Sequence, residues 1–155
     1  MRKGGPMRAI WLVCLAGAAI QGCGRTQKET SDAHYPFLVS GPEAERIASD
    51  MVRRVRTLME KGDMEGYHKL CCLRRRQENT VQHLRENYDK NPEENRLRAR
   101  TTQLLRVFPP GRSDPFIDLA VSHGDQDKEF WRLVYEEGEW RVAGMGRKIA
   151  DLGYN

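Results

Sequence analysis

The chain has 155 residues, of which 26 are Lys or Arg and 22 are Asp or Glu, which gives a formal charge of +4. Residues 1–22 contain three of these cations and no acid, so the remainder holds 23 basic against 22 acidic residues. A nearly neutral remainder argues against a nucleic-acid-binding protein, because such binding needs a net basic surface. The 31% charged residues exclude a protein with several membrane spans, and the length is that of one domain.

The N-terminal segment has the layout of a secretory signal. A basic stretch at residues 1–8 precedes twelve uncharged residues, 9–20, and then Gly22-Cys23-Gly24. An apolar run of twelve is short of the ~20 residues that span a bilayer as a helix. Met7 is a second candidate start, because a basic residue and the whole apolar run still follow it.

Residues 20–23, Ile-Gln-Gly-Cys, resemble the lipobox of bacterial lipoproteins. The resemblance implies cleavage before Cys23, a diacylglycerol on its thiol and, in many bacteria, an acylated amine. Two or three acyl chains hold a protein at a bilayer far more firmly than one. We therefore expect a protein of the bacterial envelope that faces the periplasm or the exterior. Gly24 favours the outer membrane in a cell that has two. Cys14, the rival cysteine, lies inside the apolar run.

The expected organisation is a signal peptide at 1–22, a lipidated cysteine with a tether at 23–41, and one α+β domain at 42–155. Residues 24–34 are polar, and we expect them to form a flexible linker. Residues 35–39 are apolar, and we favour an extended segment packed on the domain over a free binding motif.

Helical periodicity dominates the first part of the domain. Apolar residues from Ala44 to Met59 recur at helical spacing, with Ser40 and Glu43 in a capping-box pattern and Gly62 as the stop. Asp63 is a good N-cap for a short second helix that ends near Cys72. Residues 74–79 read as a polar break, and a third helix is expected at about 80–88.

Residues 92–106 are ambiguous. Asn91-Pro92 is a typical helix start, and the apolar residues that follow keep helical spacing, but Leu97, Ala99 and Thr101 also alternate. A strand ending at Val107 is therefore an alternative to a helix. Pro109-Pro110 ends either element.

The last third has the period of two that is typical of strands. Residues 117–122 alternate before a turn at 124–127, and Glu137-Gly138 is expected to be the two-residue loop of a hairpin. The register that follows pairs Tyr135 with Trp140, Leu133 with Val142, and Trp131 with Gly144. The expected centre of the core is one face of this hairpin, packed on the first helix, with these side chains: Trp131, Leu133, Tyr135, Trp140 and Val142.

The order of elements resembles the cystatin-like, nuclear-transport-factor-two-like superfamily. The features that carry the resemblance are the long first helix, the short helix after Gly62-Asp63 and the C-terminal meander that ends at residues 133–142. The resemblance implies a curved antiparallel sheet that encloses a cone-shaped pocket, which members use for catalysis, for ligand binding or for no known purpose.

Cys71-Cys72 is the most conspicuous candidate for chemistry. Adjacent cysteines make a strained disulfide, because their Cα atoms lie about 3.8 Å apart, so we favour two buried thiols over a strained pair or an intermolecular bond. With His68 they would supply at most three metal ligands from one turn. We expect no metal site and no cofactor.

The histidines lack catalytic spacing, and Asp118 and His123 should lie on opposite faces of one strand. A dyad of His68 with Asp118 would need a tertiary contact. The basic run at residues 74–76 is interpreted as a solvated loop; contact with anionic headgroups or a polyanionic envelope polymer is the alternative.

The expected function is that of a membrane-anchored, non-catalytic binding or assembly module with no catalytic residue. The alternatives are a pocket that binds a small ligand or catalyses a reaction, and a structural spacer. The pocket would be excluded if Trp131, Trp140 and Tyr135 filled the space between the first helix and the hairpin.

Overall fold

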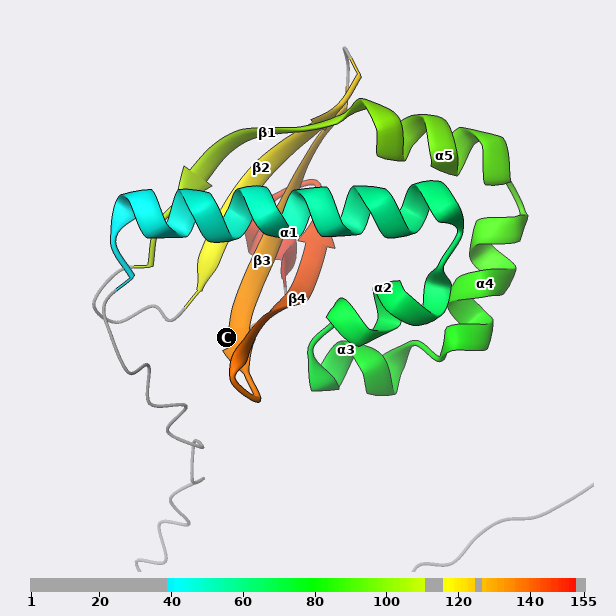
Figure 1. Cartoon of the computed structure of the whole chain (residues 1–155), viewed down its shortest axis with the longest axis horizontal. Helices are drawn as coiled ribbons and strands as arrows, with labels where there is room; N and C mark the ends of the chain where they lie inside the picture. The colour runs from blue at the N-terminus through cyan, green and yellow to red at the C-terminus, as the bar shows by residue number, and fades with distance from the viewer. Residues whose placement is uncertain (1–38, 111–115, 125–126, 153–155) are drawn as a thin grey trace, which may run out of the picture. The chain divides into compact units, whose positions relative to one another are not determined.

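A computed structural model of the chain describes residues 39–110, 116–124 and 127–152. Five helices precede four strands that form one open antiparallel sheet in the order β1-β2-β3-β4 (Figure 1). The predicted α+β class, with N-terminal helices and a C-terminal antiparallel sheet, is confirmed. The elements are α1 Gly41–Lys61, α2 Met64–Leu70, α3 Leu73–Glu78, α4 Val81–Asp89, α5 Pro92–Thr101, β1 Thr102–Phe108, β2 Ile117–His123, β3 Asp127–Glu136, β4 Glu139–Gly146 and the 3₁₀ helix η1 Ile149–Leu152.

The local signals at both ends of α1 work as predicted. The Ser40 hydroxyl accepts from the Glu43 N–H, and Gly62 takes a left-handed φ of 69° that directs its N–H to the last carbonyls of the helix. Asp63 then caps α2 by accepting from the Gly66 N–H at 2.8 Å. Thr80 caps α4 in the same way through the His83 N–H.

The predicted polar break at residues 74–79 is wrong, because Leu73–Glu78 forms α3. A helix this short needs partners for its first N–H groups, and the hairpin supplies them. The Cys72 N–H donates to the Val142 carbonyl, and the Leu73 N–H donates to the Glu136 carboxylate at 2.9 Å.

The ambiguous segment at residues 92–106 contains both elements. It is helical through Thr101 and extended from Thr102, where β1 begins to pair with β2 opposite His123. Pairing with β2 therefore decides where the helix ends and the strand begins.

The β3–β4 hairpin keeps the predicted register near its turn and departs from it farther along. Glu137 and Gly138 have φ of 54° and 82°, as a two-residue hairpin loop requires, and Tyr135 pairs with Trp140. A bulge then shifts the ladder between Arg132 and Leu133. The predicted pairing of Trp131 with Gly144 is therefore wrong.

After the bulge, Trp131 pairs with Met145, and Arg132 pairs with Gly144. The predicted central core is correct for three of its five members, which are buried: Trp131, Leu133 and Val142. The other two, Tyr135 and Trp140, are half-buried and meet edge to face with ring centres 5.5 Å apart.

The sheet lies between α1 and η1. Helix α1 crosses one face of the sheet (Figure 1), lies mainly over β1 and β2, and shares one hydrophobic core with Leu119, Trp131 and Leu133. The other face carries the Asp118–Arg132 ion pair, whose two hydrogen bonds are both 2.8 Å long, and η1 packs on β3 and β4. The last three residues of the expected tether are described: Val39 joins the core, Ser40 caps α1, and Gly41 begins that helix. Residues 1–38, with Cys23 and the rest of the expected tether, lie outside the described residues.

Candidate functional site

A cavity of about 260 Å³ lies where α1, α2 and α5 meet one end of the sheet. At ~30 Å³ per water, it has room for roughly nine waters or a ligand of that size. Its apolar lining residues are Val55, Met59, Tyr67, Ala99, Trp131 and Met145. Its polar lining residues are Arg56, Asn95, Arg98, Thr102, His123 and Glu129.

Strand geometry accounts for the wall of the cavity that the sheet provides. Glu129 and Trp131 are two residues apart on β3 and therefore point to the same face. The bulge in β4 places Met145 opposite Trp131, where regular pairing would have placed Gly144. The bulge thus contributes a large, adaptable side chain to the cavity wall.

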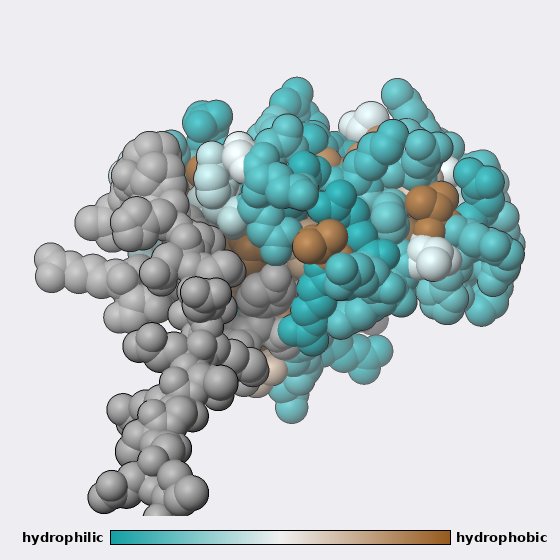
Figure 2. All heavy atoms as spheres, turned by 90° about the horizontal axis from the view of Figure 1, so that it is seen from below, coloured by the Kyte–Doolittle hydropathy of each residue, from teal (hydrophilic) through white to brown (hydrophobic). Residues whose placement is uncertain are grey.

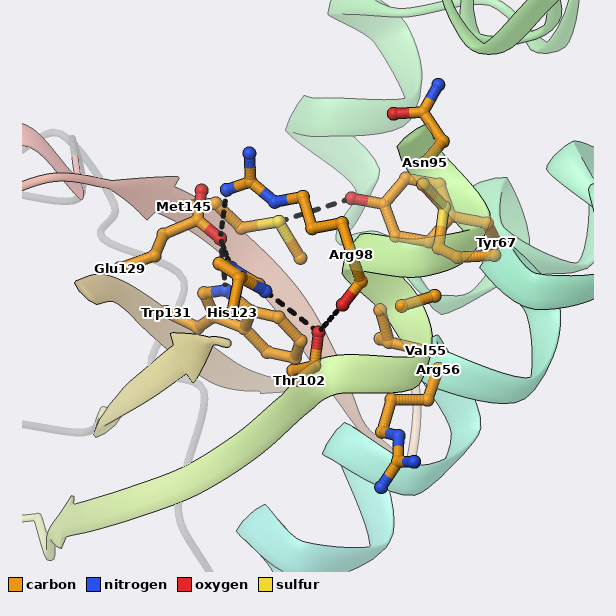
Figure 3. Close-up of a pocket in the computed structure, with 12 residues that line it drawn as sticks. Val55, Arg56, Tyr67, Asn95, Arg98, Thr102, His123, Glu129, Trp131 and Met145 are labelled. Atoms are coloured by element: carbon orange, nitrogen blue, oxygen red, sulfur yellow. Dashed lines mark hydrogen bonds and ion pairs between the residues drawn. The ribbon is translucent and has the colours of Figure 1, made fainter. Parts of the chain in front are cut away.

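Four side chains at this end of the sheet form a chain of hydrogen bonds (Figure 3). The Thr102 hydroxyl lies 2.7 Å from the Arg98 carbonyl oxygen and 2.8 Å from Nδ1 of His123. Nε2 of His123 lies 2.9 Å from Oε2 of Glu129, and the Trp131 indole N–H donates to the same oxygen at 2.9 Å.

Both ring nitrogens of His123 are engaged in this chain. A carbonyl oxygen cannot donate, so the Thr102 hydroxyl donates to the Arg98 carbonyl. Nδ1 of His123 lies against the Thr102 oxygen and Nε2 lies against the Glu129 carboxylate, and the tautomer of the ring determines which of them donates.

Glu129 is held as a carboxylate. Burial acts to raise the pKa of Glu129, but the hydrogen bonds from His123 and Trp131 and the charge of Arg98 outweigh it and lower this pKa below its usual value. Nε2 of His123 is therefore the donor to this carboxylate. The His123 side chain is only 6% exposed, which shields the contact from solvent.

The Arg98 side chain is held more loosely than those of His123 and Glu129. One guanidinium nitrogen lies 3.5 Å from Oε2 of Glu129, and the side chain is 48% exposed. Figure 3 shows Arg98 reaching across the site toward Glu129, whereas the Arg56 guanidinium points away from the cluster and donates to the Arg100 carbonyl at 3.0 Å.

Tyr67 forms the opposite wall. Its hydroxyl donates to Sδ of Met145 at 3.4 Å and accepts from Arg75 at 3.4 Å. Burial raises the pKa of Tyr67 to about 12, although the charge of Arg75 opposes the shift. Tyr67 is thus a neutral phenol at any physiological pH and contributes mainly a ring surface.

Cys71 and Cys72 are both buried free thiols, as predicted. Burial raises the pKa of Cys71, so little of it is the reactive thiolate. His68 contacts the Arg76 carbonyl at 3.2 Å. Across the described ranges, no group of three or more His, Cys, Asp or Glu side chains could hold a metal.

The other residues considered from the sequence are placed apart from the cavity. Asp118 pairs with Arg132, so the dyad of His68 with Asp118 does not form. The arginines of residues 74–76 are engaged: Arg74 with Glu78, Arg75 with Tyr67, and Arg76 with Glu137.

Sequence reasoning missed Glu129, Arg98 and Thr102. The alternation of β3 could have placed Glu129 beside Trp131, but nothing local signals that Thr102 and His123 meet across two strands. Cys23 lies outside the described residues.

Comparison of the chain with protein families, with curated proteins and with solved structures gave no match. No helix in the described part of the chain is long and apolar enough to cross a membrane.

Proposed function

We propose that this chain is a lipid-anchored protein of the bacterial envelope whose folded domain binds a small ligand without transforming it. The observation that carries the proposal is the cavity beneath α1. Trp131 forms part of its wall rather than filling it, and Tyr135 and Trp140 are not among its lining residues. The condition that would exclude a pocket is therefore not met.

Two observations favour a ligand in the cavity over assembly through an apolar surface. The coloured part of the face seen in Figure 2 is mostly hydrophilic, and the hydrophobic areas on it are small and separate. The large exposed hydrophobic side chains among the described residues, Leu73, Leu97 and Leu105, lie on three different elements. An assembly surface would be expected to gather such side chains in one patch.

Binding without chemistry fits the way the polar groups of the cavity are used. In the pair best suited to acid–base work, His123 donates to the Glu129 carboxylate. Both ring nitrogens of His123 are occupied, so neither is directed at a substrate.

The anchor and the finer fold assignment are also part of the proposal. The lipobox-like residues 20–23 support a diacylglycerol on Cys23, which would tie the domain to the membrane. A long helix packed across an antiparallel sheet, with a cavity between them, supports a cystatin-like arrangement.

Blocking the cavity tests the proposal. In the full mature chain carrying Cys23→Ser, which removes the lipid site, small amphipathic fragments are screened by calorimetry and by changes in tryptophan fluorescence. Ala99 is buried and lines the cavity, so Ala99→Leu should weaken any bound fragment about tenfold or more.

The matched control is Leu97→Ala on the same helix, since Leu97 is 62% exposed; it should leave binding unchanged. Circular dichroism and thermal melting verify that both variants are folded. A fragment set with no saturable binding, or equal binding in Ala99→Leu, would contradict the proposed function.

A further inference from the structure

We infer that the ligand of the cavity is a small apolar molecule with a single carboxylate, which the Arg98 guanidinium holds at the polar side of the cavity. The inference rests on the proposed binding function and names the chemical class of the ligand.

The first step is that Glu129 does not need Arg98. Oε2 of Glu129 receives one donor from His123 and one from Trp131, each at 2.9 Å. Arg98 approaches the same oxygen at 3.5 Å, beyond an ordinary hydrogen bond between these groups. If Arg98 turned away, the carboxylate would keep both of its shorter contacts.

The second step is the charge of the cluster. Among the described residues that line the cavity, Glu129 is the one carboxylate, and Arg56 and Arg98 are the two guanidinium groups. These fixed charges sum to about +1, and Arg98 is the cation that faces the cavity, because Arg56 is directed to the Arg100 carbonyl. A single negative charge balances this site, whereas a phosphate monoester carries about −1.5 to −2 at neutral pH.

The third step is geometry. A guanidinium offers a planar pair of N–H groups that matches the two oxygens of a carboxylate, and such charge-assisted pairs are stronger than neutral hydrogen bonds. Arg98 is 48% exposed and comes from α5 at the edge of the cavity, so it can turn to a ligand without disturbing the core. Val55, Met59 and Trp131 provide an apolar wall for the rest of the molecule.

A matched set of ligands tests the inference. The full mature chain with Cys23→Ser is titrated by calorimetry with 3-phenylpropionate, its primary amide 3-phenylpropionamide, and 3-phenylpropylamine. The three probes share one apolar skeleton and differ in charge. The carboxylate should bind about tenfold or more tightly than the amide, and the amine should bind most weakly.

Two arginine variants locate the effect. Arg98→Gln removes the guanidinium and should reduce the preference for carboxylate over amide to less than threefold, with amide binding unchanged. Arg96→Gln is the control, because it removes the same charge from the same helix at a residue that pairs with Glu93 and does not line the cavity. It should keep the preference.

The outcomes separate the two proposals. Equal affinity for acid and amide, tighter binding of the amine, or a preference that survives Arg98→Gln would overturn the inferred ligand class and leave the binding function standing. The same conclusion follows if none of the three binds although other fragments occupy the cavity. If no fragment binds at all, both proposals fail.

Discussion

Glu129 illustrates how one side chain can be both buried and charged. Two donors, from His123 and Trp131, converge on one of its oxygens, and the Arg98 guanidinium lies 3.5 Å from the same oxygen. Without them, burial would favour the neutral acid. The carboxylate is thus part of a network in which each member orients the next, and His123 and Trp131 are its nearest partners.

A pH dependence of stability follows from this arrangement. Because the pKa of Glu129 is lower in the folded state than its ordinary value of 4.5, the unfolded chain binds a proton first as the pH falls. The stability from this carboxylate is therefore complete above pH 4.5 and is lost as the pH falls through the folded pKa.

Glu129→Gln should accordingly cost about 2 kcal/mol at pH 6 and progressively less below pH 4.5, measured by urea unfolding. Glu65→Gln is the control, because Glu65 is an exposed carboxylate in an i,i+4 pair with Lys69; it should change stability by about 0.5 kcal/mol or less. A penalty for Glu129→Gln that is constant from pH 6 to pH 3 would contradict the assigned charge state.

Among the elements, β4 has the most consequences for the site. Its bulge moves Met145 into the position opposite Trp131 and places Gly144 opposite Arg132, under η1. A Cβ built on Gly144 would lie 2.5 Å from the Leu152 carbonyl oxygen. The absence of a side chain at Gly144 therefore allows η1 to pack on the sheet.

Gly144→Ala should destabilise the domain by about 1–3 kcal/mol, because the clash is with backbone that cannot rotate away. The measurement is urea unfolding, together with hydrogen exchange of residues 149–152, which should become faster. Gly41→Ala is the control, since a Cβ there would meet nothing within 4 Å. Unchanged stability and exchange in Gly144→Ala would show that η1 is not held by this contact.

Helix α3 shows a different kind of dependence on neighbours. Its sequence is charged and short, and its N-terminal N–H groups are satisfied by Val142 and Glu136 from the hairpin. One of its side chains also binds the hairpin, since Arg76 pairs with Glu137 at 3.0 Å. Residues 73–78 are therefore helical because of their contacts with the hairpin.

For the whole molecule, the proposed anchor and the proposed cavity are independent features. The charge of +4 comes mainly from residues 1–22, so the mature chain would be almost neutral. A nearly neutral domain is not held at an anionic membrane by its overall charge, so the proposal assigns attachment to the lipid.

Intact-mass analysis of the membrane fraction tests the anchor. The wild-type chain should begin at Cys23 and carry the added mass of a diacylglycerol, and Cys23→Ser should abolish both the cleavage and the added mass. Cys14→Ser, in the apolar run, is the matched control and should be processed like wild type. An unmodified wild-type chain that begins elsewhere would remove the lipoprotein assignment without affecting the cavity.

Several features of this protein were predictable from the sequence because the interactions behind them are local. The caps at Ser40, Asp63 and Thr80 and the stop at Gly62 depend on atoms within a few residues. The alternation in β2 and the first pairs of the hairpin follow from a period of two and a two-residue loop. The burial of Cys71 and Cys72 was also predicted correctly.

The tertiary structure decided the remaining features, because their causes lie far apart in the chain. The boundary between α5 and β1 depends on pairing with β2, and α3 depends on the hairpin. The bulge that turns Met145 toward Trp131 becomes evident only when both strands are aligned. The cluster of Arg98, Thr102, His123 and Glu129 joins one helix to three strands, so the hydrogen bond between His123 and Glu129 exists only because folding brings the two side chains within 2.9 Å.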